Sequence, residues 1–123
     1  MARLPSLADD RIPVRFGPQT AAEPHDALLI EGDAAADQAA VARFVVPAAF
    51  AGHPVGCACC VPRGPVAAAL GKLFLARARG ELPWFRGVLV VARSAAGEAA
   101  VRAALAGDVV TAARFREEGQ ATA

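Results

Sequence analysis

The three cysteines of the chain are the residues whose types and spacing could do chemistry. They occupy three of four consecutive positions, as Cys57, Cys59 and Cys60. In an extended chain Cys57 and Cys59 point to one face and Cys60 to the other, so the backbone must bend for all three to converge. Three thiolates and one further ligand form the tetrahedral set that suits zinc or a similar divalent ion. The sequence therefore predicts a metal-binding thiolate cluster.

His53 could supply the fourth ligand, because it lies four positions before Cys57. The alternative, a loop histidine beside Pro54 with no ligand role, stays open. The predicted metal ligands are thus Cys57, Cys59, Cys60 and His53, and the predicted cofactor is Zn²⁺ or a similar ion.

A disulfide fits the cysteine spacing poorly. Adjacent Cα atoms lie about 3.8 Å apart, whereas a relaxed disulfide needs about 4.4–6.8 Å, which disfavours a bond between Cys59 and Cys60. A bond between Cys57 and Cys59 would close a small, strained ring, and no cysteine elsewhere could serve as partner. Burial of the three as small apolar side chains remains an alternative to metal binding.

Length and composition indicate one compact domain. The 123 residues are 55% hydrophobic, which suffices for a core. With 13 basic and 12 acidic residues the net charge is +1, so neither nucleic acid nor an anionic membrane is indicated as a partner. Unpaired thiols fit the reducing cytoplasm. The first ten residues contain Asp9 and Asp10 and no apolar run, unlike a secretory signal.

One uncharged stretch, residues 44–62, has about the length that a bilayer requires. Three prolines and two glycines interrupt it, and a lone helix broken in this way would leave backbone groups unpaired in lipid. We therefore interpret the stretch as a buried strand, a loop and the cysteine cluster, and expect no membrane span.

Hydrophobic periodicity and chain-breaking residues predict the elements that must position the cluster. Strands are expected at residues 12–16, 26–31, 43–46 and 87–92, and helices at 34–42 (capped by Asp33), 65–79, 98–106 and 109–116. Residues 1–10 are then a flexible arm, 11–116 a single α/β domain and 117–123 a polar tail.

The helix at 65–79 connects the elements to the chemistry. Pro65 suits its first position, and Val66, Leu70, Leu73 and Phe74 share one face. The helix begins shortly after Cys60. Its positive N-terminal end, with Arg63, would favour thiolate over thiol.

The apolar run at 87–92 is typical of a strand buried on both faces of a parallel sheet. A strand, a crossover helix and a second strand in this order predict right-handed parallel connections. The expected fold class is therefore α/β, a small, mostly parallel sheet with flanking helices.

With these elements placed, the chain resembles the CobW-like P-loop GTPases, a family of metal-insertion chaperones. The motif Gly56–Cys60 has the family's form G-C-x-C-C, and Arg63-Gly64-Pro65-Val66 matches the segment that follows it. The segments 108–110 and 114–116 are similar to a later acidic-Pro-Val helix that ends in Arg-Phe-Arg. The resemblance covers about residues 52–116, and it implies a truncated P-loop NTPase core.

The chain departs from this family where nucleotide would bind. The strand at 12–16 should lead into G-x-x-x-x-G-K-[ST], whose backbone and Lys hold phosphates. Instead, residues 17–24 contain no Lys, no second Gly and two prolines. The family's Glu after the buried strand is also absent. We therefore expect no bound nucleotide, no catalytic residues and no GTPase activity of this chain alone. A nucleotide-binding enzyme with an unusual phosphate loop is the last-ranked alternative.

Together these features predict a cytoplasmic, metal-binding, CobW-related protein that lacks the GTPase machinery, a degenerate GTPase. Metal storage, delivery or a metallochaperone-like role would follow from the resemblance. The alternative is a non-catalytic interaction module or homo-oligomer without a metal role. Glu31 and Asp33, at the carboxyl end of a predicted strand, could also bind a metal, but solvated turn acids explain them better.

Overall fold

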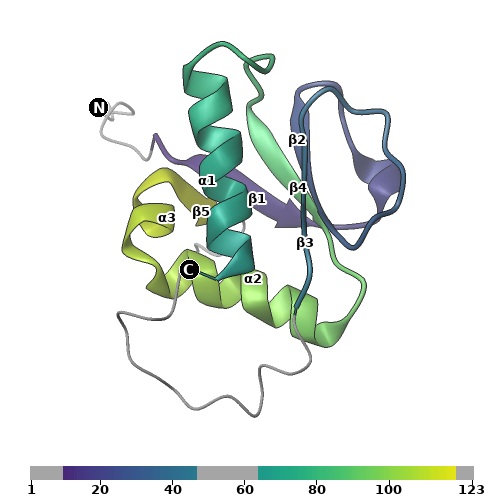
Figure 1. Cartoon of the computed structure of the whole chain (residues 1–123), viewed down its shortest axis with the longest axis vertical. Helices are drawn as coiled ribbons and strands as arrows, with labels where there is room; N and C mark the ends of the chain where they lie inside the picture. The colour runs from purple at the N-terminus through teal and green to yellow at the C-terminus, as the bar shows by residue number, and fades with distance from the viewer. Residues whose placement is uncertain (1–9, 47–63, 119–123) are drawn as a thin grey trace, which may run out of the picture.

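The computed structural model describes residues 10–46 and 64–118. Within them, a five-stranded sheet has the order β3-β2-β4-β1-β5, and every neighbouring pair is parallel (Figure 1). The predicted α/β class with a parallel sheet is therefore confirmed. The strands are β1 (Ile12–Phe16), β2 (Asp26–Glu31), β3 (Val41–Phe44), β4 (Gly87–Val91) and β5 (Phe115–Glu117).

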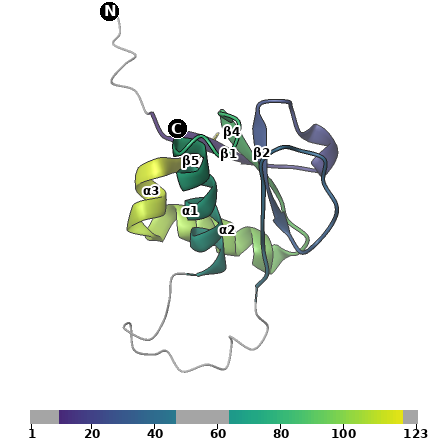
Figure 2. The ribbon, with the colours of Figure 1, turned by 45° about the horizontal axis from the view of Figure 1, so that its top comes forward.

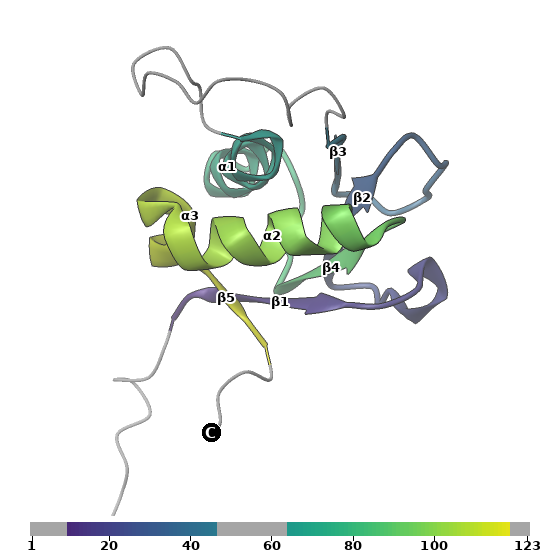
Figure 3. The same cartoon turned by 90° about the horizontal axis from the view of Figure 1, so that it is seen from below.

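The α-helices of the described residues all lie on one face of this sheet, as Figure 3 shows. They are α1 (Pro65–Ala78), α2 (Ala95–Gly107) and α3 (Val109–Arg114). The other face is covered by the connections 17–25, which contains the 3-10 turn η2 (Gln19–Ala21), and 32–40. The sheet thus has a helix face and a loop face.

The strand order explains this division. From β1 through β2 to β3 the chain moves toward one edge, then returns to place β4 beside β1 and β5 beyond it. Right-handed crossovers in opposite directions lie on opposite faces of a parallel sheet. The direction in which the chain crosses the sheet from strand to strand differs after β1 and after β4. Their carboxyl ends therefore form the topological switch point, where such sheets bind ligands.

The main core lies between the sheet and its helix face. Val88 and Val90 of β4 and Leu70 of α1 have no exposed surface, and Val66 and Leu73 of α1 are 2% exposed. The predicted inward face of α1 is therefore confirmed. Burying each such side chain contributes about 1.5–3 kcal/mol.

The predicted helix at 34–42 is wrong. Residues 33–40 form a connection without helix or strand, and β3 spans Val41–Phe44 instead of the expected 43–46. The segment is rich in alanine but has no large apolar stripe, and helix propensity alone rarely sustains a short helix in water. Pairing of β3 with the buried β2 determines the strand register instead.

In the C-terminal part of the chain, the start of α2 and the end of α3 differ from those predicted. α2 begins at Ala95, three residues before the predicted start, because Ser94 caps it. α3 ends at Arg114, and an unpredicted strand, β5, follows it. Phe115 is 1% exposed and meets the Phe74 ring edge-on at 6.1 Å, so burial of one aromatic ring favours the strand over a longer helix. Glu117, expected in the tail, ends β5.

Candidate functional site at the carboxyl edge of the sheet

The carboxyl end of β2 is joined to the N-terminus of α2 by Glu31. One of its carboxylate oxygens accepts hydrogen bonds from the backbone N–H groups of Arg93, over 2.6 Å, and Ser94, over 2.9 Å. The other accepts from the Ser94 hydroxyl over 2.8 Å. The Ser94 Oγ in turn accepts from the N–H of Gly97 over 2.9 Å. A carboxylate therefore occupies the position at a helix N-terminus that favours an anion.

These contacts shift the acidity of Glu31. Burial raises the pKa of its carboxyl, but the hydrogen bonds from Ser94 and from the Arg93 and Ser94 backbones lower it further, and the net pKa lies below its ordinary value. Gly97 is buried against this carboxylate, and a Cβ built at Gly97 would overlap it. The site is thus formed around an ionised glutamate and leaves no room for a side chain at position 97.

The carboxyl end of β1 lies on the other side of the switch point. The N–H of Gly17 donates to the Val90 carbonyl over 3.2 Å. The chain then passes through Pro18 and η2 and crosses the loop face, where Ala22 packs on the cluster of Leu28, Ile30 and Leu89. The β1–β2 connection therefore contains a 3-10 turn where a phosphate-binding loop and helix would stand in the resembled family.

A two-pronged ion pair fixes this connection. The guanidinium of Arg15 donates to both oxygens of Asp26, over 3.0 and 2.9 Å, and to the Ala21 carbonyl over 2.9 Å. Asp26 is only 7% exposed and also accepts from the Glu23 N–H over 2.8 Å. Burial raises the pKa of Asp26, yet the bonds from Arg15 and Glu23 more than offset this and the net pKa is lowered.

The N-terminus of α1 differs from those of the other α-helices that the structure describes. Ser94 caps α2, and the Asp108 carboxylate caps α3 by accepting from the Thr111 N–H over 2.9 Å. By contrast, Gly64 at the α1 N-cap has no side chain to offer, and the first turn of α1 contains no acid. The positive end of this fourteen-residue helix is therefore not neutralised by a capping side chain.

Two grooves flank this helix end. One, of about 410 Å³, separates the first turn of α1 from α2 and is lined mainly by small residues, among them Gly64, Ala67 and Ala104. Figure 2 shows α2 passing beside that end of α1. The other, of about 320 Å³, separates α1 from β3. The start of α1 is thus accessible from two sides of the described domain.

The predicted metal ligands, His53, Cys57, Cys59 and Cys60, all lie outside the described residues. They belong to residues 47–63, which follow Val46, two positions after the end of β3, and precede Gly64. Among residues 10–46 and 64–118, no three His, Cys, Asp or Glu side chains are grouped so as to hold a metal ion.

Several other polar and aromatic residues lie at separate places in the fold. Glu31 is bonded to Ser94, the N-cap of α2, whereas Asp33, two positions on, is exposed. His25 is exposed before β2. Trp84 is 63% exposed while Phe85 is 2% exposed, and the Arg77 guanidinium lies 3.7 Å from the Trp84 ring centroid. The same guanidinium lies 5.1 Å from the Phe85 ring centroid, so Arg77 packs on two aromatic rings.

The sequence analysis missed both polar clusters. Arg15 interrupts an otherwise apolar strand and Asp26 opens the next one, which is a weak signal for an ion pair. The partnership of Glu31 with Ser94 spans 63 positions and has no local signature. Only Ser94 itself, a favoured N-cap residue before an alanine-rich run, was visible in the sequence.

Comparison with protein-family models, with curated proteins and with solved structures finds no match to this chain. The CobW resemblance therefore remains an expectation drawn from the sequence motif. No helix within the described residues is long and apolar enough to cross a membrane.

Proposed function

We propose that the chain is a CobW-related metal-binding protein, in which Cys57, Cys59 and Cys60 hold Zn²⁺ or a similar divalent ion. His53 is the proposed fourth ligand. Three sulfur donors and one imidazole match the soft, tetrahedral preference of zinc. The proposed role is metal storage or delivery without nucleotide hydrolysis.

One structural observation supports this proposal above others, the uncapped N-terminus of α1. Cys60 lies four positions before the N-cap Gly64, and no side chain of the described residues caps the helix. Thiolates are stabilised near the positive end of a helix, which lowers the thiol pKa. Metal binding requires deprotonated cysteines, so a helix end of this kind would strengthen binding at neutral pH.

The connection after β1 supports the part of the proposal that excludes nucleotide. Its backbone is directed across the loop face and held by Arg15 and Asp26. Just before the N-terminus of α2, the Glu31 carboxylate accepts the backbone N–H groups of Arg93 and Ser94 and places a negative charge where an anionic ligand would bind. Both features suit a role in which metal is bound by the cysteine segment alone.

Cobalt titration of the reduced, metal-free protein tests the ligand set. Tetrahedral thiolate ligation should produce sulfur-to-cobalt charge-transfer absorption that reaches a plateau at one ion per chain. Replacing any one of the three cysteines by serine should weaken that absorption, and His53→Ala should shift the visible bands while keeping the charge transfer. If wild type and a triple Cys→Ser variant give the same spectrum, the assignment is wrong.

A further inference from the structure

The outer strand β3 has a strand neighbour on one side only within the described part of the chain. It ends the sheet and pairs with β2. The N–H of Leu28 donates to the Ala40 carbonyl and that of Gly32 to the Phe44 carbonyl, each over 2.9 Å. Alternate residues of this segment, 40, 42 and 44, therefore face β2.

The intervening residues of β3 face outward. In a parallel ladder, a residue between two bonded positions directs its N–H and C=O away from the partner strand. Val41 and Arg43 therefore present their backbone groups at the outer edge. Such an edge is a template onto which another extended segment can pair.

The groove of about 320 Å³ between β3 and α1 runs beside this edge. On the helix side, three small or compact residues and one long cation line it: Pro65, Ala68, Ala69 and Lys72. The small side chains on this side of the helix leave space for the side chains of an added strand. The edge and the groove therefore form one continuous surface.

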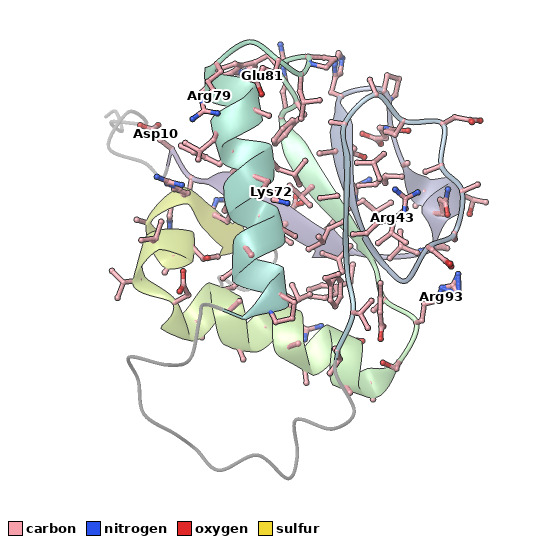
Figure 4. All side chains as sticks on the ribbon, viewed as in Figure 1. Asp10, Arg43, Lys72, Arg79, Glu81 and Arg93 are labelled. Carbon is pink, nitrogen blue, oxygen red and sulfur yellow. The ribbon has the colours of Figure 1, made fainter. Side chains whose placement is uncertain are left out.

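Two cations flank this surface on opposite faces of the sheet. Lys72 is exposed on α1, and Figure 4 shows it directed from the helix toward β3. Arg43 is exposed and is aligned with Ile30, a residue of the loop-face cluster. The Arg43 guanidinium donates to the Ala34 carbonyl over 2.8 Å. Neither cation forms a salt bridge with another described residue.

We propose that this surface binds an extended acidic peptide, which adds to β3 as a sixth strand. Side chains of a strand alternate between the two faces, so consecutive acids in the peptide would meet Lys72 on one face and Arg43 on the other. Backbone pairing with Val41 and Arg43 would provide the register. A second copy of this chain fits less well, because pairing two β3 strands would place the Arg43 side chains of the two copies near each other.

The test uses a labelled peptide of about ten residues, with a central Glu-Glu pair flanked by alternating Val and Thr. Fluorescence anisotropy should show saturable binding to the full-length protein that weakens as salt is raised. A Gln-Gln version should bind more weakly. A version with proline beside the central pair should lose binding, since it lacks a backbone donor.

Matched variants separate charge from backbone pairing. Lys72→Glu should weaken binding about three- to tenfold, whereas Arg79→Glu, the same reversal at the far end of α1, should leave it unchanged. Val41→Pro removes an outward N–H at the first residue of an edge strand, where proline is tolerated. It should weaken binding about tenfold relative to Val41→Ala, with both variants checked for folding by circular dichroism.

Three results would overturn the proposal. The first is no binding of the Glu-Glu peptide to wild type, which would mean that the edge charges serve only to prevent pairing. The second is equal weakening by Lys72→Glu and Arg79→Glu, which would indicate nonspecific attraction. The third is a concentration-dependent dimer that Val41→Pro abolishes while peptide binding is absent, which would assign the edge to self-pairing.

Discussion

The carboxylate of Glu31 accepts two hydrogen bonds from Ser94, one from its backbone N–H over 2.9 Å and one from its hydroxyl over 2.8 Å. This contact fastens the carboxyl end of β2 to the start of α2. It also places a fixed negative charge at the sheet edge where parallel α/β folds bind ligands. At this edge of the sheet, the position where a ligand would bind is therefore occupied by the Glu31 side chain.

Replacing Glu31 by glutamine should lower the free energy of unfolding by about 1–2 kcal/mol at neutral pH, because Ser94, the N-cap of α2, loses its ionised partner. The folded pKa of Glu31 lies below its ordinary value. Its contribution is therefore fully present above the ordinary pKa and is lost as the pH falls through the folded pKa. Urea titrations from pH 7 to pH 3 should show the difference from wild type shrinking in acid.

Asp33→Asn is the matched control for Glu31→Gln, because Asp33 is an exposed acid two positions away on the same edge. Its effect should stay within about 0.5 kcal/mol. A loss for Asp33→Asn as large as that for Glu31→Gln would mean that local charge, and not the cap, is what stabilises the domain.

Gly97→Ala should destabilise the protein although alanine is the better helix former by about 1 kcal/mol. The new Cβ would overlap the Glu31 carboxylate. In a Glu31→Ala background the same substitution should become neutral or stabilising, which a double-mutant cycle by thermal unfolding would reveal. Gly107→Ala, at the open end of the same helix, should not destabilise, since nothing lies near its added Cβ.

Arg15→Ala should cost about 2 kcal/mol, because it removes both prongs of the pair with the buried Asp26 carboxylate. Arg15→Lys should recover only part, since an ammonium cannot make the forked contact. The net pKa of Asp26 is lowered, so the loss should be largest above its ordinary pKa and fade as the pH falls through the folded pKa. Equal stability of Arg15→Lys and wild type by urea titration would contradict the forked geometry.

Gly64→Asp should strengthen α1 but weaken metal binding. Gly64 is exposed in extended backbone with open space around its Cβ position, so aspartate fits there and would cap the helix. Its charge would compete with nearby thiolates for the positive helix end and reduce zinc affinity about two- to fivefold. Gly64→Asn, an uncharged cap, should stabilise α1 without that reduction. Competition titration with a zinc chelator would measure the zinc affinity of both variants.

The sequence predicted best where local signals and burial agree. Strand β2 was expected at its observed bounds, and α1 begins at Pro65 as expected because proline suits a first turn. The predicted end of α1, residue 79, is one residue beyond the observed end at Ala78, and Gly80 follows with a positive φ of 77°. In each case the deciding residue and the element lie within one segment.

Features decided by distant contacts could not be predicted from the sequence. The alanine content of residues 34–42 suggested a helix, but Val41 and Ala42 pair with Leu28 and Leu29 of β2. The side-by-side placement of β1 and β5 exists only in the folded sheet. Glu31 looked like a turn acid because its partner, Ser94, follows only after two further strands and a helix. The candidate metal ligands are the reverse case, a motif visible only in the sequence.

Metal analysis of protein purified under reducing conditions without chelator tests the central proposal most directly, with the variant C57S/C59S/C60S prepared in parallel. Wild type should retain close to one zinc or similar ion per chain, held tighter than about 1 μM, and the triple variant should retain none. Wild-type protein that holds no more metal than the triple variant would contradict the proposed function.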